Sequence, residues 1–217
     1  MRKEKRLPED LVLRFLDHVV FDGWSQGALE AAAKDIGKDK MFVRRVAPKG
    51  PEDMVWAFND IANAKMLAVI AEMNIDGLPV RERIGTAVRV CLQQNASHKE
   101  AVRKMLSYLA IPQHAALAVK CTFATVDTIW RVAGDTSTDF NFYTKRSLLA
   151  GVYGSTVLYW LSDGSEDHAD TWAFLERRIS NIMQIPKFQM AIRDRVSRLP
   201  YPDRFLKIKP ARSADLD

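Results

Sequence analysis

The chain has 217 residues, of which 47% are hydrophobic and 27% are charged, and its formal net charge is +5. This length and hydrophobic content suffice for a well-packed core and exclude a disordered or fibrous chain. The only two cysteines, Cys91 and Cys121, lie in separate apolar helical patterns, which excludes a disulfide framework and a paired-cysteine zinc site and indicates a reducing compartment.

The first 50 residues are predicted to form three short helices joined by glycine turns. Apolar residues at helical spacing and turns at Gly23 and Gly37 place these helices at 8–22, 25–36 and 40–46. Three helices of decreasing length in this order are typical of a helix-turn-helix headpiece.

The segment Phe21-Asp-Gly-Trp-Ser-x-x-Ala-Leu-x-x-Ala-Ala-x-x-Ile-Gly37 resembles the start of the tetracycline-repressor-like regulators. That resemblance implies possible DNA binding by basic residues on or near the third helix: Lys34, Lys38, Lys40, Arg44 and Arg45. Those regulators usually continue with an aromatic-rich segment that packs the reading helix. Here Pro48 and Pro51 form a stiff link instead, which weighs against DNA recognition.

Longer helices are predicted for the rest of the chain, at 51–75, 79–94, 97–109, 112–133, 140–161 and between the turn at 162–165 and Pro186. The predicted fold class is therefore all-α, with about ten helices in a repressor-like architecture. We expect a headpiece at 1–50, a helical body at 51–185, and a tail at 186–217 that holds a short amphipathic segment and a disordered end.

The predicted helix at 140–161 is apolar on nearly all sides. Such a helix is either the centre of the core or the wall of an apolar cavity. Gly151, Gly154 and Ser155 interrupt it with small residues, which permit close helix packing or leave room for a ligand. The core interpretation is the simpler one, and both stay open at this stage.

The tail carries a basic amphipathic segment. Phe188, Ile192, Val196 and Leu199 fall on one helical face, and basic residues surround them, which favours contact with an anionic membrane surface or docking on the body. No apolar run reaches the roughly 18 residues that a spanning helix needs. The charged start lacks the apolar stretch of a signal peptide, so we expect a cytoplasmic protein.

No enzymatic motif is present. The sequence has no glycine-rich phosphate loop, no Gly-x-Ser-x-Gly and no Glu-x-x-His pair, and its four histidines are scattered. The acidic residues around Asp163 are typical of helix-cap chemistry. We therefore expect no catalysis, no cofactor and no metal site.

The corner between the predicted helices at 112–133 and 140–161 combines Trp130, Gly134, a Ser/Thr/Asp turn and the pair Phe142 and Tyr143. Gly134 can end a helix in the left-handed conformation, so a well-capped corner is one interpretation. Large aromatic residues at a surface corner also favour a partner or lipid contact.

Residues 125 to 183 resemble the ubiquinone biosynthesis accessory family. The resemblance rests on Ile129-Trp-x-x-Ala-Gly-Asp135-x-Ser-Thr-Asp139-x-Asn-Phe142-Tyr-Thr-Lys-Arg146, followed by Tyr153, Leu158 and Asp170-Thr-Trp-x-Phe-Leu-x-x-Arg178. Phe142 and Lys145 depart from the tryptophan and arginine that this family more often shows. Both departures keep aromatic or basic character.

This resemblance implies a non-catalytic protein that binds isoprenoid lipids or quinone intermediates in its helical body and presents them to the demethoxyubiquinone hydroxylase. Repressor-like folds commonly form dimers, so we expect a homodimer paired through the eighth and ninth predicted helices, and the basic tail favours a peripheral position on the inner face of a membrane. The expected partner-binding residues are Asp127, Ile129, Trp130, Asp135, Asp139, Phe142, Tyr143 and Arg146. The expected lipid-binding residues are Leu148, Val152, Tyr153, Thr156, Tyr159, Trp160 and Trp172, and the expected membrane-binding residues are those of the tail face.

Two other functions compete with this one. A repressor-like transcription regulator would sense an apolar effector in the same cavity and bind DNA through the third helix. A purely structural helical dimer would have a solid core in place of a cavity.

Overall fold

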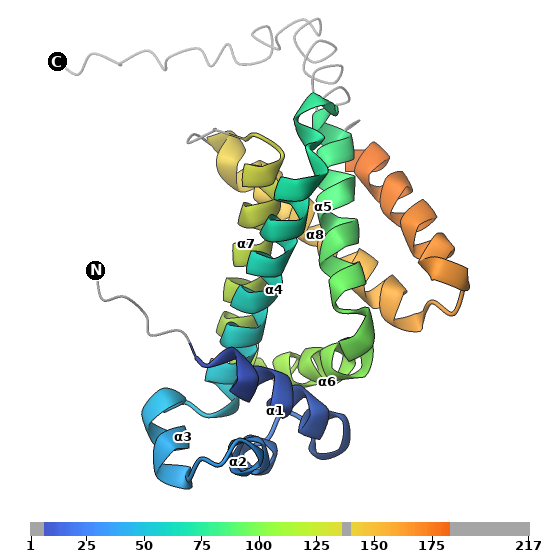
Figure 1. Ribbon diagram of the computed structural model, residues 1–217. Helices are drawn as coiled ribbons and strands as arrows, with labels where there is room; N and C mark the ends of the chain where they lie inside the picture. Colours follow the sequence, from blue (N-terminus) through green and yellow to red (C-terminus); the bar gives the residue numbers. More distant parts are fainter. Residues whose placement is uncertain (1–6, 136–139, 183–217) are drawn as a thin grey trace, which may run out of the picture. The chain divides into compact units, whose positions relative to one another are not determined.

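A computed structural model describes residues 7–135 and 140–182, and the described residues form helices without any strand (Figure 1). The described residues up to Ile179 belong to one compact unit. The all-α prediction is confirmed. The predicted boundary between headpiece and body at residue 50 stays a prediction.

The headpiece contains α1 (Glu9–Asp22), α2 (Gln26–Asp35) and α3 (Lys40–Val46). The Ser25 hydroxyl accepts a hydrogen bond from the Ala28 amide at 3.1 Å, and the Asp39 carboxylate accepts one from the Phe42 amide at 2.8 Å. Both side chains cap a helix start, which is why these two boundaries could be predicted from residue type. Gly23 has a φ of 67° at the turn between α1 and α2.

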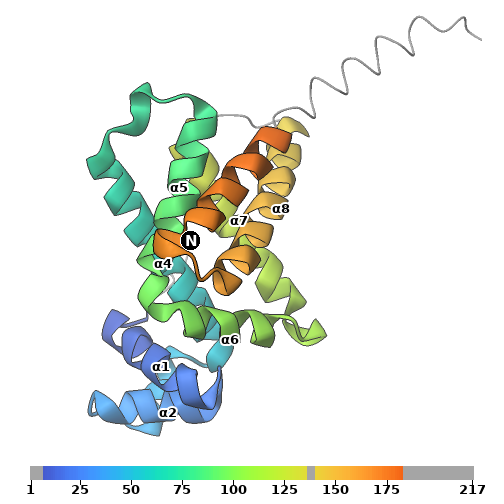
Figure 2. The same cartoon turned by 90° about the vertical axis from the view of Figure 1, so that its right-hand side faces the viewer.

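The body contains α4 (Pro51–Met73), α5 (Val80–Gln94), α6 (Lys99–Leu109), α7 (Ala115–Val132), α8 (Phe140–Ser162) and a helix at 169–182. α4 packs against both α5 and α7, and α7 packs against α8. In both ribbon views α6 crosses the lower ends of these helices, next to the headpiece (Figures 1 and 2).

Several body helices are shorter than predicted because tight turns come before or after them. Pro112–His114 forms a separate 3-10 turn before α7, and Ala96–His98 forms one before α6. α4 ends at Met73 because Asn74 takes a left-handed conformation with a φ of 46°, and a 3-10 turn over Ile75–Gly77 follows.

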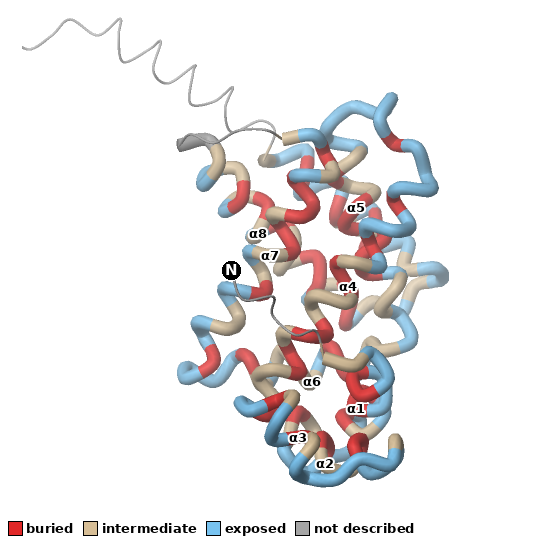
Figure 3. Tube along the Cα trace, turned by 60° about the vertical axis from the view of Figure 1, so that its left-hand side comes forward, coloured by how far each residue is buried: buried red, intermediate tan, exposed pale blue. Residues whose placement is uncertain are grey.

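The buried residues form a continuous core through the helices of the described unit (Figure 3). Trp24 connects the headpiece to this core. Its ring packs edge-on against Phe15 with 5.1 Å between ring centroids, and its Nε1 donates a hydrogen bond to the carbonyl oxygen of Ala101 on α6 at 3.0 Å. Trp24 therefore contacts both the headpiece and the body and holds them together.

The turn after α8 is held by Asp163. Its carboxylate accepts hydrogen bonds from the Ser165 amide at 2.8 Å and the Thr171 amide at 2.9 Å, and also from the Thr171 hydroxyl. Burial by itself would raise the pKa of this carboxyl group, but the hydrogen bonds from Thr171 and Ser165 outweigh it and hold the pKa well below its usual value. The expected cap chemistry is therefore present in this turn.

Candidate functional site

The corner between α7 and α8 is built around Arg146, which is 3% exposed. Its Nε donates to the Asp127 carboxylate at 2.8 Å, and its Nη1 donates to the Asp135 carboxylate at 3.1 Å. Lys145 Nζ lies 2.7 Å from the second Asp135 oxygen, and Arg131 Nη2 lies 3.0 Å from the second Asp127 oxygen. We call these five side chains the Arg146 cluster.

The Arg146 cluster supports the aromatic residues of the corner. The guanidinium carbon of Arg146 lies 3.4 Å from the centroid of the Phe142 ring, a close cation–π contact. Phe142 packs edge-on against Tyr143 at 5.1 Å between centroids and faces Phe123 of α7 at 6.2 Å. We call Phe123, Phe142 and Tyr143 the aromatic edge.

Trp130 does not belong to this edge. We expected it to be an exposed aromatic residue, but it is buried and 7% exposed. Its Nε1 donates to the carbonyl oxygen of Lys145 at 3.1 Å, so it joins α7 to the start of α8 from the inside. The expectation of an exposed tryptophan was wrong because the return of α8 along α7 covers that face.

The structure divides the predicted partner-binding residues into supporting and exposed groups. Tyr143 is 65% exposed and Phe142 is half-buried. Asp139 lies outside the described residues. The remaining predicted residues are buried or partly buried and hold the corner in place: Asp127, Ile129, Trp130, Asp135 and Arg146.

Phe123 belongs to none of the motifs that single out residues in the sequence, although its spacing on α7 offers an indication. It lies four residues before Asp127 on α7 and is 41% exposed, and Val119, a further four residues back, is 69% exposed. Residues at this spacing share one helical face. An exposed apolar stripe on α7 therefore leads to the aromatic edge.

Two of the predicted lipid-binding residues border a small cavity among the described helices. A cavity of about 40 Å³ lies among α4, α5, α6, α7 and α8, which is space for about one water molecule. Of the seven predicted lipid-binding residues, only Tyr153 and Trp160 line it.

The other predicted lipid-binding residues are engaged elsewhere. The Thr156 hydroxyl donates to the backbone oxygen of Val152 at 2.7 Å, and Tyr159 stacks on Phe174 with 4.6 Å between centroids. Trp172 is 8% exposed and donates from Nε1 to the carbonyl oxygen of Asp167 at 2.7 Å. Leu148 is half-buried. Whether these residues contact lipid stays a prediction.

The tail face predicted to bind a membrane, formed by Phe188, Ile192, Val196 and Leu199, lies outside the described residues. Within the described ranges, no helix has the length and apolar character needed to cross a bilayer.

The described residues offer no obvious reactive group. No three His, Cys, Asp or Glu side chains among them lie close enough together to hold a metal ion. Burial raises the pKa of Cys91 to about 11, although a hydrogen bond from Tyr153 opposes the shift, and burial also raises that of Cys121 to about 11. Both thiols are therefore protonated at neutral pH and poor nucleophiles.

A solved structure defines the class of fold. The crystal structure of the TetR transcriptional regulator from Nitrosomonas europaea ATCC 19718 superimposes with a TM-score of 0.65 over 79% of this chain and 95% of that chain, at 20% sequence identity. This protein therefore has a TetR-like fold. At this identity the likeness establishes the fold alone.

The sequence relatives identify the chain more closely. Residues 115–186 match the COQ9 family model. The mitochondrial ubiquinone biosynthesis protein COQ9 of Rattus norvegicus is 31% identical over 189 residues, which cover 84% of this chain and 60% of that protein. The Drosophila melanogaster protein of the same name is 33% identical over 78% of this chain and 53% of its own length. This chain is therefore similar in sequence to the COQ9 proteins and spans about 60% of the length of the first of these relatives.

Proposed function

We propose that this protein is a non-catalytic accessory protein of ubiquinone biosynthesis, which binds isoprenoid lipids or quinone intermediates and presents them to the demethoxyubiquinone hydroxylase. The observation that carries this proposal is the position of the family match. Residues 115–186 contain α7, α8, the Arg146 cluster and the helix at 169–182. The related proteins are named as ubiquinone biosynthesis proteins.

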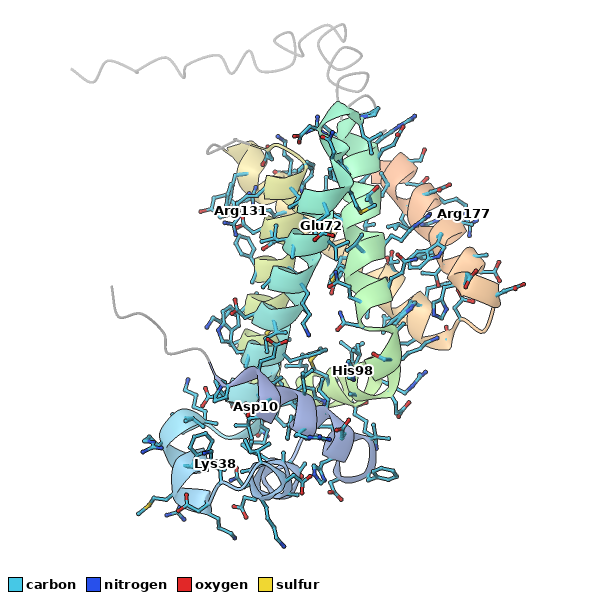
Figure 4. All side chains as sticks on the ribbon, in the orientation of Figure 1. Asp10, Lys38, Glu72, His98, Arg131 and Arg177 are labelled. Carbon is cyan, nitrogen blue, oxygen red and sulfur yellow. The ribbon has the colours of Figure 1, made fainter. Side chains whose placement is uncertain are left out.

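The aromatic edge is the surface that we assign to the hydroxylase. Exposed aromatic residues that are fixed from below by buried contacts lose little freedom when a partner binds, and such residues supply much of the binding energy in interfaces. Phe142 is held by Arg146, and Tyr143 projects beside it with 65% exposure. Arg131, 66% exposed, adds positive charge on the neighbouring turn of α7 (Figure 4).

Tyr143→Ala is expected to weaken binding of purified demethoxyubiquinone hydroxylase about 30-fold, because truncating a central aromatic contact costs about 2 kcal/mol. Biolayer interferometry of the two proteins measures the change in Kd. The matched control is Leu158→Ala, a residue of α8 with 63% exposure that lies about 22 Å farther along the helix. Equal affinities of the two variants would remove the aromatic edge from the interface.

The lipid part of the proposal is tested by mass spectrometry of the organic extract from gently purified protein, with a heat-denatured and washed sample as control. Stoichiometric isoprenoid or quinone species are expected, because a buried chain contributes about 0.8 kcal/mol per methylene. A clean extract, together with no uptake of added isoprenoid quinone, would overturn lipid binding.

We assign the body to a homodimer, because repressor-like folds commonly pair through their body helices.

We assign the tail at 186–217 to contact with the anionic inner face of the membrane. The basis for this assignment is the apolar face of the tail segment and the basic residues around it. Loss of vesicle binding on removal of residues 187–217 is the expected result. Unchanged binding to vesicles containing anionic lipid would refute this assignment.

DNA binding is the second candidate function, and the TetR-like fold favours it. Lys38, just before α3 (Figure 4), and Arg45, within α3, each lie 5.7 Å from the centroid of the Phe42 ring. Lys40 is already paired with Glu30 at 2.8 Å. A steep salt dependence of binding to duplex DNA, lost in Arg44→Glu, would promote this function over the accessory role.

A further inference from the structure

The cavity of about 40 Å³ in the body has an unusual lining for the centre of a helical core. Three asparagine side chains face it from α4 and from the end of α5, and α7 contributes a threonine: Asn59, Asn63, Asn95 and Thr125. Aromatic side chains of Phe58, Tyr153 and Trp160 form much of the remaining wall. Buried amide groups are unfavourable unless they find hydrogen-bond partners.

Most of these polar groups are paired with one another. Asn59 Nδ2 donates to Thr125 Oγ1 at 2.9 Å, and Asn63 Nδ2 donates to Asn59 Oδ1 at 3.3 Å. Asn95 Nδ2 donates to the backbone oxygen of Cys91 at 2.7 Å. These hydrogen bonds fix the orientation of the Asn63 amide group. Its nitrogen donates to Asn59, so its oxygen is left at the end of the series.

Two polar atoms of the lining have no partner. They are Oδ1 of Asn63, a residue 8% exposed, and Nε1 of Trp160, a residue with no exposed surface. One is an acceptor and the other is a donor. A native core seldom leaves such atoms unpaired, so this pair is a candidate for the recognition of a polar group that enters the cavity.

We propose that Asn63 and Trp160 form a polar notch that binds the hydroxyl group of a phenol-headed amphiphile. A hydroxyl group donates one hydrogen bond and accepts others, so it satisfies both atoms at once. A quinone carbonyl or a methyl ether oxygen only accepts, and it would leave Asn63 Oδ1 unpaired. This inference rests on the proposed lipid-binding function and specifies the head group that the same site prefers.

The size and walls of the cavity agree with this assignment. The present space accepts one oxygen-sized group, and the aromatic walls suit an attached ring. Met105 of α6 lines the cavity and is half-buried. Its flexible side chain can turn aside to admit the ring, which extends the site toward the outside of the body.

The test compares two probes that differ by one methyl group, 2-geranylphenol and 2-geranylanisole, by isothermal titration calorimetry of the full chain. The wild-type protein is expected to bind the phenol at least tenfold more tightly than its methyl ether, because a site built to pair a hydroxyl group rejects an analogue that leaves a buried group unpaired. Equal affinities would show that the notch holds a structural water only and would overturn the proposal.

Variants locate the effect. Asn63→Leu removes the unpaired acceptor at similar volume and is expected to abolish the preference while it retains binding of the ether. Gln93→Leu makes the same kind of change at an exposed position of α5 and is expected to keep the preference. A preference that persists in Asn63→Leu would overturn the assignment of the residue. Failure of both probes to bind wild-type protein would instead overturn the proposed lipid function, and if Asn63→Leu does not fold, the wild-type comparison still decides.

Discussion

Replacement of Arg146 with methionine is expected to lower the free energy of unfolding by about 3 kcal/mol, the lower end of the range for breaking a buried ion pair. Arg146 is 3% exposed and bridges Asp127 and Asp135, whose side chains are 23% and 5% exposed. Methionine fills much of the same space but leaves Asp127 without its partner on α8. Lys145 still lies 2.7 Å from Asp135, which limits the loss. Urea unfolding followed by far-ultraviolet circular dichroism measures this change.

Arg131→Met is the matched control for this experiment. Arg131 contacts the same Asp127 at 3.0 Å, but its side chain is 66% exposed, and surface ion pairs contribute about 0–1 kcal/mol. Both variants remove one positive charge from Asp127, but only Arg146→Met removes a buried charge and the contacts with Asp135 and Phe142. A loss in Arg146→Met no larger than that in Arg131→Met would show that the Arg146 cluster does not hold the corner.

The Arg146 cluster stabilises the corner between α7 and α8 and also holds the aromatic edge of the proposed interface in place. Arg146 lies directly under the Phe142 ring, so its loss frees a residue of the aromatic edge. Trp130 supports the same corner through its bond to the Lys145 carbonyl. The buried members of the predicted partner-binding set therefore act by fixing the exposed members, and their substitution changes the fold and the surface together.

The helix boundaries that the sequence predicts well are those marked by local chemistry. Ser25 and Asp39 cap the starts of α2 and α3, and Pro51 stands at the first residue of α4. Caps depend on residues within one turn, so residue type suffices to place them. The end of α4 is an exception, because the left-handed conformation of Asn74 ends the helix at Met73, two residues before the predicted end at residue 75.

Burial at the corner could not be predicted in the same way. Trp130 and Tyr143 are both aromatic residues near one turn, yet one is 7% exposed and the other 65%. The difference depends on how α8 packs along α7, which no local pattern encodes. The same limit applies to the lipid site, because helical periodicity shows that α8 is apolar but not whether its neighbours close around it.

Trp24→Ala is expected to lower the free energy of unfolding by about 3–5 kcal/mol, the range for removing a large buried aromatic side chain. Trp24 is 5% exposed, packs against Phe15 and bonds to the Ala101 carbonyl, so its loss leaves a cavity and removes a hydrogen bond where headpiece and body meet. Phe21→Ala, at an aromatic residue with 85% exposure three positions earlier, is expected to change stability by less than about 0.5 kcal/mol. Differential scanning calorimetry measures the unfolding transition of both variants.

Because Trp24 joins α1 and α6, a single unfolding transition at a lower temperature is expected for Trp24→Ala. Retention of the wild-type transition would show that the headpiece does not depend on this contact.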